Sequence, residues 1–269
     1  MPPASPSDTI PTDTNGHPKT ETRFVPGGTL VDRRHPVQEI GPTVGLYVWQ
    51  YPLRLFHWGM VLSLAVLSFT GYYIHDPFII GQVKYPFLMG WFRFAHEAFG
   101  MAFIALFIMR IALFFQGNRW VGWRQYIPLH ASQWREMVNV MKFYAFINPK
   151  PVSKIGHNAM AAFSYIGIYA LILVEIVTGL VLYNRLAHGA FLGFLVGWVP
   201  GVMSVQNLRL IHFFLMFVFI AFAVFHVHLC MLISRVEKRG LMDSIFIGYK
   251  VIPEDELEEE EKKAIAERS

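Results

Sequence analysis

The sequence is too apolar and too weakly charged for a soluble globular domain. Of its 269 residues, 54% are hydrophobic and only 16% are charged, whereas soluble domains carry roughly 25% charged and about 45–50% apolar residues. A lipid bilayer would cover the excess apolar surface. The formal charge of +4 is of the kind that membrane topology produces, so we expect no nucleic-acid partner.

A single cysteine, Cys230, limits the chemistry that the chain can hold. Disulfide frameworks, Cys-ligated zinc fingers and Cys-held iron–sulfur clusters each need two or more cysteines. Any metal or cofactor must therefore be bound by other side chains. The chain has 11 histidines, which makes imidazole the first ligand to consider.

The two ends of the chain are polar. Residues 1–45 are rich in Pro, Thr, Asp and Gly and contain no apolar run, so they predict a disordered cytoplasmic tail ahead of a retained first span. Residues 251–269 carry a run of acidic and basic side chains, which predicts a second charged cytoplasmic tail. The folded domain is expected over residues 46–250.

Four segments are apolar and long enough to cross a bilayer, which takes about 20 residues at a helical rise of about 1.5 Å. They are residues 55–74, 94–115, 159–183 and 210–233. Residues 190–203 are also apolar, but they are short and interrupted by glycine, and we expect an interfacial or re-entrant piece there. The sequence therefore predicts an all-α integral membrane protein with a four-helix transmembrane bundle.

The basic residues of the loops predict the orientation of this bundle. Six Lys and Arg residues lie in the loop over residues 117–158, and three follow the last span, whereas the other two loops hold two each. Short loops rich in Lys and Arg stay in the cytoplasm. Both termini and the middle loop are therefore expected on the cytoplasmic side.

Histidines at membrane depth are the strongest functional signal. His212 and His226 are 14 residues apart in the fourth span, which is about 40° short of four full helical turns and about 21 Å along the axis. Both side chains therefore leave nearly one face of the helix at two depths. His228 lies about 200° around from His226, and we expect it to pack or to form a hydrogen bond, with a role at a quinone site as the alternative.

The topology supplies a second histidine at each depth. His57 begins the first span at the cytoplasmic level, as does His226, and His96 begins the second span at the outer level, as does His212. Any one of these could be an ordinary interfacial histidine. As two pairs at two depths inside a helical bundle, they predict two bis-histidine sites for b-type haems.

Two arginines stand one helical turn before predicted ligands. Arg54 precedes His57, and Arg93 precedes His96. Each could pair with a haem propionate, because a guanidinium recognises a carboxylate well. The alternative is an arginine that extends its charge to the membrane surface.

With these residues the chain resembles the cytochrome b subunit of membrane-bound nickel–iron uptake hydrogenases, a family that extends to the gamma subunits of formate dehydrogenases. The matching stretches lie between residues 46 and 250. They are YPLRLFHW at 51–58, WFRFAHEAFG at 91–100, GNR at 117–119, IGHN at 155–158 and the His-Val of FHVHLC. The resemblance implies the same ligand pairs, His96 with His212 and His57 with His226.

The resemblance also implies partners and a location in the bacterial inner membrane. A hydrogenase of small and large subunits at the outer face would pass electrons to the outer haem, the inner haem and a membrane quinone. The hydrogen-activating site cannot be in this chain, because one cysteine cannot ligate it. We therefore expect an electron-transfer subunit without catalytic residues for hydrogen oxidation, and a larger symmetric assembly stays open.

The quinone is expected near the inner haem. His157 and Asn158 begin the third span at that level and offer hydrogen bonds to a quinone carbonyl. The alternative for Asn158 is a helix cap. Glu175 lies about 24 Å along the span, too far from the cytoplasmic side to protonate such a quinone.

Two other functions compete with this one. The first keeps the cytochrome but changes the partner to a formate dehydrogenase or a related molybdenum reductase. The second is a haem-free, histidine-rich membrane anchor or transporter. A transporter would tend to mix acidic ligands with the histidines, and the matched depths argue against it.

Overall fold

The computed structural model describes residues 23–25, 29–32, 43–78, 86–127, 131–148 and 155–266. The chain forms two compact units. One is Gln50–Lys238, and the other combines the two chain ends, Met1–Trp49 and Arg239–Ser269.

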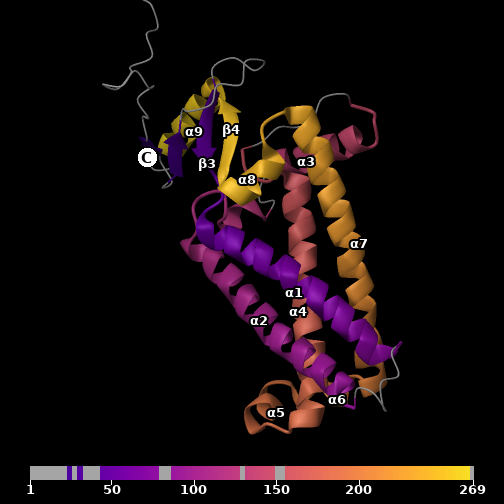
Figure 1. Ribbon diagram of the computed structural model, residues 1–269. Helices are drawn as coiled ribbons and strands as arrows, with labels where there is room; N and C mark the ends of the chain where they lie inside the picture. The colour runs from indigo at the N-terminus through magenta and orange to yellow at the C-terminus, as the bar shows by residue number, and fades with distance from the viewer. Residues whose placement is uncertain are drawn as a thin grey trace, which may run out of the picture. The chain divides into compact units, whose positions relative to one another are not determined.

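Four helices of the larger unit are long and apolar enough to cross a membrane. They are α1 (Tyr51–His75), α2 (Leu88–Gln116), α4 (Ala159–Ala187) and α7 (Val205–Glu237). In the bundle α1 packs on α2 and α4 packs on α7 (Figure 1). The prediction of four membrane-spanning helices is confirmed, and the chain is mostly but not entirely helical. The helices run a few residues past the predicted segments, because hydropathy marks the apolar centre of a span and not its polar ends.

Side chains at the helix starts explain where α4 and α7 begin. Asn158 Oδ1 accepts a hydrogen bond from Ala161 N at 2.8 Å, and Ser204 Oγ accepts one from Asn207 N at 3.3 Å. Each satisfies an amide that the helix leaves without a partner. The α1 helix instead has Pro52 in its first turn, where the missing N–H costs no hydrogen bond.

The middle of the bundle is an apolar layer that separates its two ends. Phe103 and Phe107 of α2, Ile172 of α4, and Leu215 and Phe219 of α7 form a buried cluster. Leu64 of α1 packs against the same cluster. The layer holds the four helices in register, because each helix contributes at least one apolar side chain to it.

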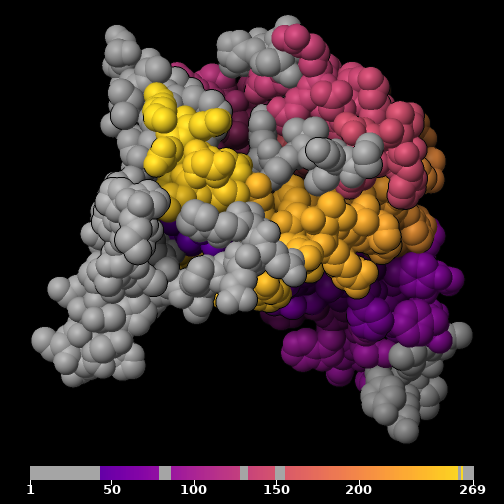
Figure 2. Space-filling model, turned by 90° about the horizontal axis from the view of Figure 1, so that it is seen from above, coloured from indigo at the N-terminus to yellow at the C-terminus, as the bar shows by residue number. Residues whose placement is uncertain are grey.

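The connections contain further helices. The middle loop includes α3 (Ala131–Tyr144), which lies beside the last turns of α7 in both views (Figures 1 and 2). Residues 190–203, predicted to be interfacial or re-entrant, form the short helices α5 (Ala190–Val196) and α6 (Val199–Val202). Their depth in the membrane stays a prediction.

The smaller unit contains a sheet that the sequence analysis does not anticipate. Strands β1 (Arg23–Val25), β2 (Thr29–Asp32), β3 (Thr43–Tyr47) and β4 (Tyr249–Pro253) pair antiparallel in that order. Two helices flank β4 in the same unit, α8 (Leu241–Ile247) before it and α9 (Glu254–Ala266) after it.

The sheet changes the domain boundaries expected for the chain. Val44 of β3 pairs with Ile252 of β4, so the two chain ends form one unit and the helical unit runs over Gln50–Lys238 rather than 46–250. Strands of three to five residues give little periodicity to read, and here the partner strand is about 200 residues away in the sequence. Most of the predicted N-terminal tail lies outside the described residues.

Candidate functional site

The bundle brings four histidines together as two pairs. The rings of His96 and His212 have centroids 6.3 Å apart, and those of His57 and His226 have centroids 6.4 Å apart. Helix α7 supplies one member of each pair, α1 supplies His57 and α2 supplies His96. These are the same pairs that helical spacing and topology predict.

Both separations fit two imidazoles bound to opposite sides of one metal ion. A metal–imidazole bond is about 2.0–2.1 Å and each ring nitrogen lies about 1.1 Å from the ring centre, so the expected centroid separation is about 6.3 Å. Among the described residues no group of three or more His, Cys, Asp or Glu side chains could hold a metal ion. A metal ion held between the two rings of either pair would therefore need its remaining ligands from a group such as a porphyrin.

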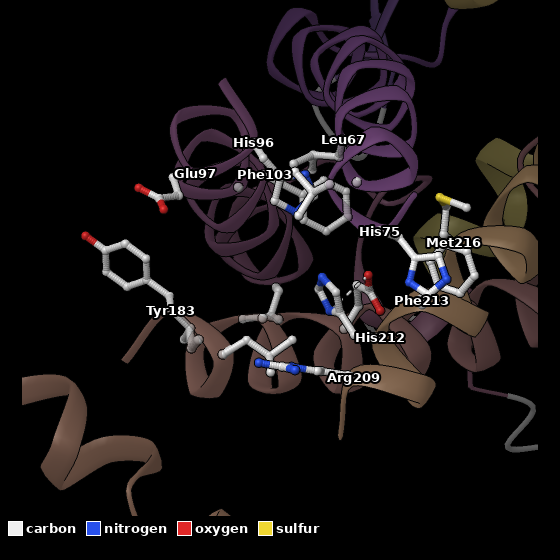
Figure 3. Close-up of a pocket in the computed structure, with 18 of the residues that line it drawn as sticks. Leu67, His75, His96, Glu97, Phe103, Tyr183, Arg209, His212, Phe213 and Met216 are labelled. Atoms are coloured by element: carbon white, nitrogen blue, oxygen red, sulfur yellow. Dashed lines mark ion pairs between the residues drawn. The ribbon is translucent and has the colours of Figure 1, made fainter. Parts of the chain in front are cut away.

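A cavity of about 850 Å³ surrounds the His96–His212 pair, which is near the upper end of the range for ligand pockets. Figure 3 shows His96 and His212 on facing walls of this cavity, with Phe103 beside His96. All four long helices line it. Its volume and mostly apolar walls suit a large flat ligand.

A threonine fixes the orientation of His96. Thr70 Oγ1 donates its only proton to the carbonyl oxygen of Val66, 2.7 Å away, and lies 2.9 Å from His96 Nδ1. Because that proton is already used, the hydroxyl oxygen accepts a hydrogen bond from Nδ1–H. The lone pair of the imidazole then resides on Nε2, the nitrogen free to bind a metal.

A second threonine does the same for His212. Thr178 Oγ1 donates to the carbonyl oxygen of Val174 at 2.9 Å and lies 3.1 Å from His212 Nδ1. Glu175 Oε1 is a further acceptor, 3.2 Å from the same nitrogen. Glu175 therefore contacts a proposed ligand, and Nε2 of His212 is again the free nitrogen.

Glycines next to these threonines leave room for the rings. A Cβ atom on Gly71 would lie 3.1 Å from His96 Cε1, and a Cβ atom on Gly179 would lie 3.1 Å from His212 Cε1. The dipeptide Thr-Gly thus occurs twice, in α1 facing His96 and in α4 facing His212. This repeat was the signal in the sequence that could have identified both threonines.

The His57–His226 pair has different surroundings. Tyr165 Oη lies 3.5 Å from His226 Nδ1, and the Phe222 ring stacks on the His226 ring at 5.8 Å. His57 Nδ1 is buried and has no hydrogen-bond partner among the described residues. Aromatic packing rather than threonine hydroxyls therefore positions this pair.

The two predicted arginines lie in different environments. Arg93 lines the cavity around His96 and His212. Arg54 has its guanidinium carbon 5.7 Å from the Tyr51 ring centre. The sequence analysis missed Arg209, which also lines the cavity and precedes His212 by one turn, at the same spacing as the other two arginines precede their histidines.

The structure puts His157 and Asn158 at the start of α4. Asn158 caps the helix, which is the alternative that the sequence leaves open for it. The His157 ring packs between Tyr126, at 5.3 Å, and Tyr165, at 5.0 Å. Burial raises the pKa of Tyr126, which keeps its phenol neutral. His228 is exposed on α7 rather than packed in the bundle, as its angular position relative to His226 explains.

Four apolar helices that present two imidazole pairs inward at two levels define the class of membrane-spanning b-type cytochromes. Comparison with known proteins gives the family. The model of the prokaryotic cytochrome b561 family matches residues 48–248. The chain belongs to this family, and it is a multi-pass protein of the bacterial inner membrane.

Relatives carry names that connect them to hydrogenases. A "Probable Ni/Fe-hydrogenase B-type cytochrome subunit" of Rhodobacter capsulatus is 31% identical over 232 residues, covering 84% of this chain and 88% of the relative. One of the same name from Azotobacter chroococcum mcd 1 is 31% identical over 226 residues, covering 81% and 93%. The "Probable Ni/Fe-hydrogenase 1 B-type cytochrome subunit" of Escherichia coli (strain K12) is 34% identical over 151 residues, covering 55% and 64%.

Proposed function

We propose that this chain is a dihaem cytochrome b that anchors a nickel–iron hydrogenase to the membrane and carries its electrons to the quinone pool. The observation that carries the proposal is the pair of centroid separations, 6.3 and 6.4 Å, at two levels of one bundle. One bis-histidine haem at each level makes a route for electrons across the bilayer.

With the middle loop and both chain ends in the cytoplasm, His96 and His212 would hold an outer haem, and His57 and His226 an inner haem. Arg93 and Arg209 line the outer cavity and would pair with the propionates there. Arg54, one turn before His57, would do so at the inner site. Haem b supplies one-electron redox chemistry when it is bound.

The chain's own residues bind and orient these groups. Thr70 and Thr178 keep the proton of each outer imidazole on Nδ1, and the apolar layer around Phe103 and Phe219 excludes water between the two levels. The outer pair would face the small and large subunits of the hydrogenase, whose nickel–iron centre and clusters lie outside this chain. The names of the relatives support that partner.

A quinone would accept the electrons near the inner pair. His157 and Asn158 are both candidates to bind it, because the helix cap uses only Oδ1 of Asn158 and leaves its Nδ2–H groups as donors to a quinone carbonyl. The packing of His157 against Tyr165, whose hydroxyl approaches His226, connects this position to the inner pair.

The alternatives have less support. A formate dehydrogenase partner would keep the same fold, but the relatives above carry hydrogenase names. A haem-free anchor or metal transporter gives no reason for two ring separations that match axial ligation.

The partner is tested in native membranes of the source bacterium, with and without a deletion of this chain. We expect hydrogen to produce the reduced-minus-oxidised spectrum of a b-type haem, and we expect that signal to be lost in the deletion strain. Reduction by formate but not by hydrogen would contradict the hydrogenase assignment. Absence of any haem in the purified chain would contradict the cytochrome itself.

A further inference from the structure

Arg110 of α2 is a buried cation that the electron route above does not use. It is 0% exposed, and no carboxylate of a described residue forms an ion pair with it. Its Nε donates to Tyr169 Oη at 3.0 Å, and both terminal nitrogens donate to the carbonyl oxygen of Val121 at 3.3 Å. The guanidinium carbon also lies 4.0 Å from the Phe114 ring centre. Neutral groups therefore hold a full positive charge inside the bundle.

Helical spacing puts Arg110 at the level of the inner pair. In each long helix, residues 14 apart lie on nearly one face and about 21 Å apart along the axis. The outer level contains His96, His212, Gly71 and Gly179. Fourteen residues after His96 and His212 stand Arg110 and His226, and 14 residues before Gly71 and Gly179 stand His57 and Tyr165. These four residues therefore share the inner level.

Contacts connect Arg110 to His57 through one residue and to His226 through two. Its guanidinium carbon lies 6.0 Å from the ring centre of Phe56, the residue before His57. Its partner Tyr169 lies one helical turn after Tyr165, whose hydroxyl is 3.5 Å from His226 Nδ1. The cation is therefore part of the shell around the inner pair. At the outer pair the ionisable side chain next to a ligand is instead the acid Glu175, 3.2 Å from His212 Nδ1.

We propose that Arg110 raises the midpoint potential of the inner haem and so directs electrons from the outer haem to the inner haem. The inference rests on the proposed function. An inner haem that gains an electron gains negative charge, and a nearby fixed cation stabilises that reduced form. Arginine suits the task, because it stays protonated even when it is buried.

The redox step is balanced between the two haems. One electron leaves the outer iron, which goes from ferrous to ferric, and reduces the inner iron from ferric to ferrous. No proton, bond change or further reactant is needed. At an effective dielectric constant of about 20, a unit charge about 10 Å from the inner iron and about 20 Å from the outer iron changes the equilibrium constant of such a transfer by about fourfold.

The test is a redox titration of the purified chain with both haems bound, comparing the natural protein with Arg110→Met and Arg110→Lys. We expect the methionine variant to lower the inner-haem potential, with about a fourfold smaller equilibrium constant for outer-to-inner transfer. The outer-haem potential should fall by only about half as much, because that haem is about twice as far from the charge, and the lysine variant should keep most of the natural inner-haem value. An unchanged inner potential in a methionine variant that binds two haems would overturn the proposal.

A second route keeps Arg110 in place, in case its removal prevents folding. Phe114→Glu would place a carboxylate beside the guanidinium and neutralise it, and Phe114→Gln is the matched uncharged control. We expect the glutamate variant alone to lower the inner potential. Equal potentials in both variants would contradict the role of the charge. A chain that binds no haem would instead contradict the proposed function, so the two failures are distinguishable.

Discussion

Thr70 of α1 and His96 of α2 are joined by a 2.9 Å contact between Oγ1 and Nδ1, and Thr178 of α4 repeats it with His212 of α7 at 3.1 Å. Each threonine donates its own proton to a carbonyl oxygen in the preceding turn of its helix. The two halves of the outer site are therefore built alike. One half adds Glu175 as a further acceptor.

The threonines should control the affinity of the outer haem. Replacement by valine removes the hydroxyl acceptor for Nδ1–H while keeping the side-chain shape. His212 keeps Glu175 as its other acceptor, so the effect should be larger for Thr70→Val. Loss of such a supporting contact typically costs about 10–100-fold in metal-site affinity. We expect Thr70→Val and Thr178→Val each to weaken retention of the outer haem, measured by haem titration into the apoprotein. Serine at the same positions should restore it, and a serine variant as weak as the valine variant would contradict the hydroxyl's role.

Gly71 and Gly179, next to these threonines, should not tolerate replacement by larger side chains. Gly179→Val would push a branched side chain toward His212, since even a Cβ atom would lie 3.1 Å from Cε1. We expect loss of the outer haem with the inner haem retained, measured by haem content and spectrum. Gly167→Val in the same helix is the control, because nothing lies within 4 Å of a Cβ there. Equal haem loss in both variants would mean a general helix effect.

Substitution of Glu175 should shift the midpoint potential of the outer haem and leave that of the inner haem unchanged. Its Oε1 atom draws the His212 Nδ1 proton toward itself, which makes the imidazole a stronger donor to iron and stabilises the ferric form. We therefore expect Glu175→Gln to raise the outer-haem midpoint potential in a redox titration. A shift confined to the inner haem would contradict this placement.

Two substitutions of Asn158 should separate its role as a helix cap from any role in quinone binding. Asn158→Ala removes the bond to Ala161 N and should destabilise the protein by about 1 kcal/mol. Asn158→Ser keeps a cap but loses the amide. We expect a lower midpoint of thermal unfolding in the alanine variant only, and normal quinone turnover in the serine variant. Slow turnover in the serine variant, with normal haem reduction, would give the amide a direct role at the quinone.

Sequence periodicity was enough to predict the bundle and its histidine pairs. The 14-residue interval between His212 and His226, together with alternating helix direction, leaves one arrangement of partners, and the ring separations agree with it. The spacing of Arg209 before His212 was equally visible but was not used. Hydropathy predicts spans because every lipid-facing segment must be long and apolar.

Other features depend on contacts that the sequence does not display. The repeated Thr-Gly dipeptide marks Thr70 and Thr178, but only the neighbouring helix shows that each hydroxyl lies beside an imidazole. The pairing of β3 with β4 joins strands at opposite ends of the chain, and short strands carry too little pattern to predict such a partner. Arg110 was visible only as one charge near the end of a span, and its burial depends on Tyr169 and Val121.

The most direct test of the central claim is a count of haem by pyridine haemochrome in the purified chain and in four single histidine-to-alanine variants, at His57, His96, His212 and His226. We expect two b haems in the natural chain and one in each variant. Spectra should be alike within each pair, with the outer haem lost in His96→Ala and His212→Ala and the inner haem lost in the other two. Loss of the same haem from His57→Ala and His212→Ala would contradict the assignment.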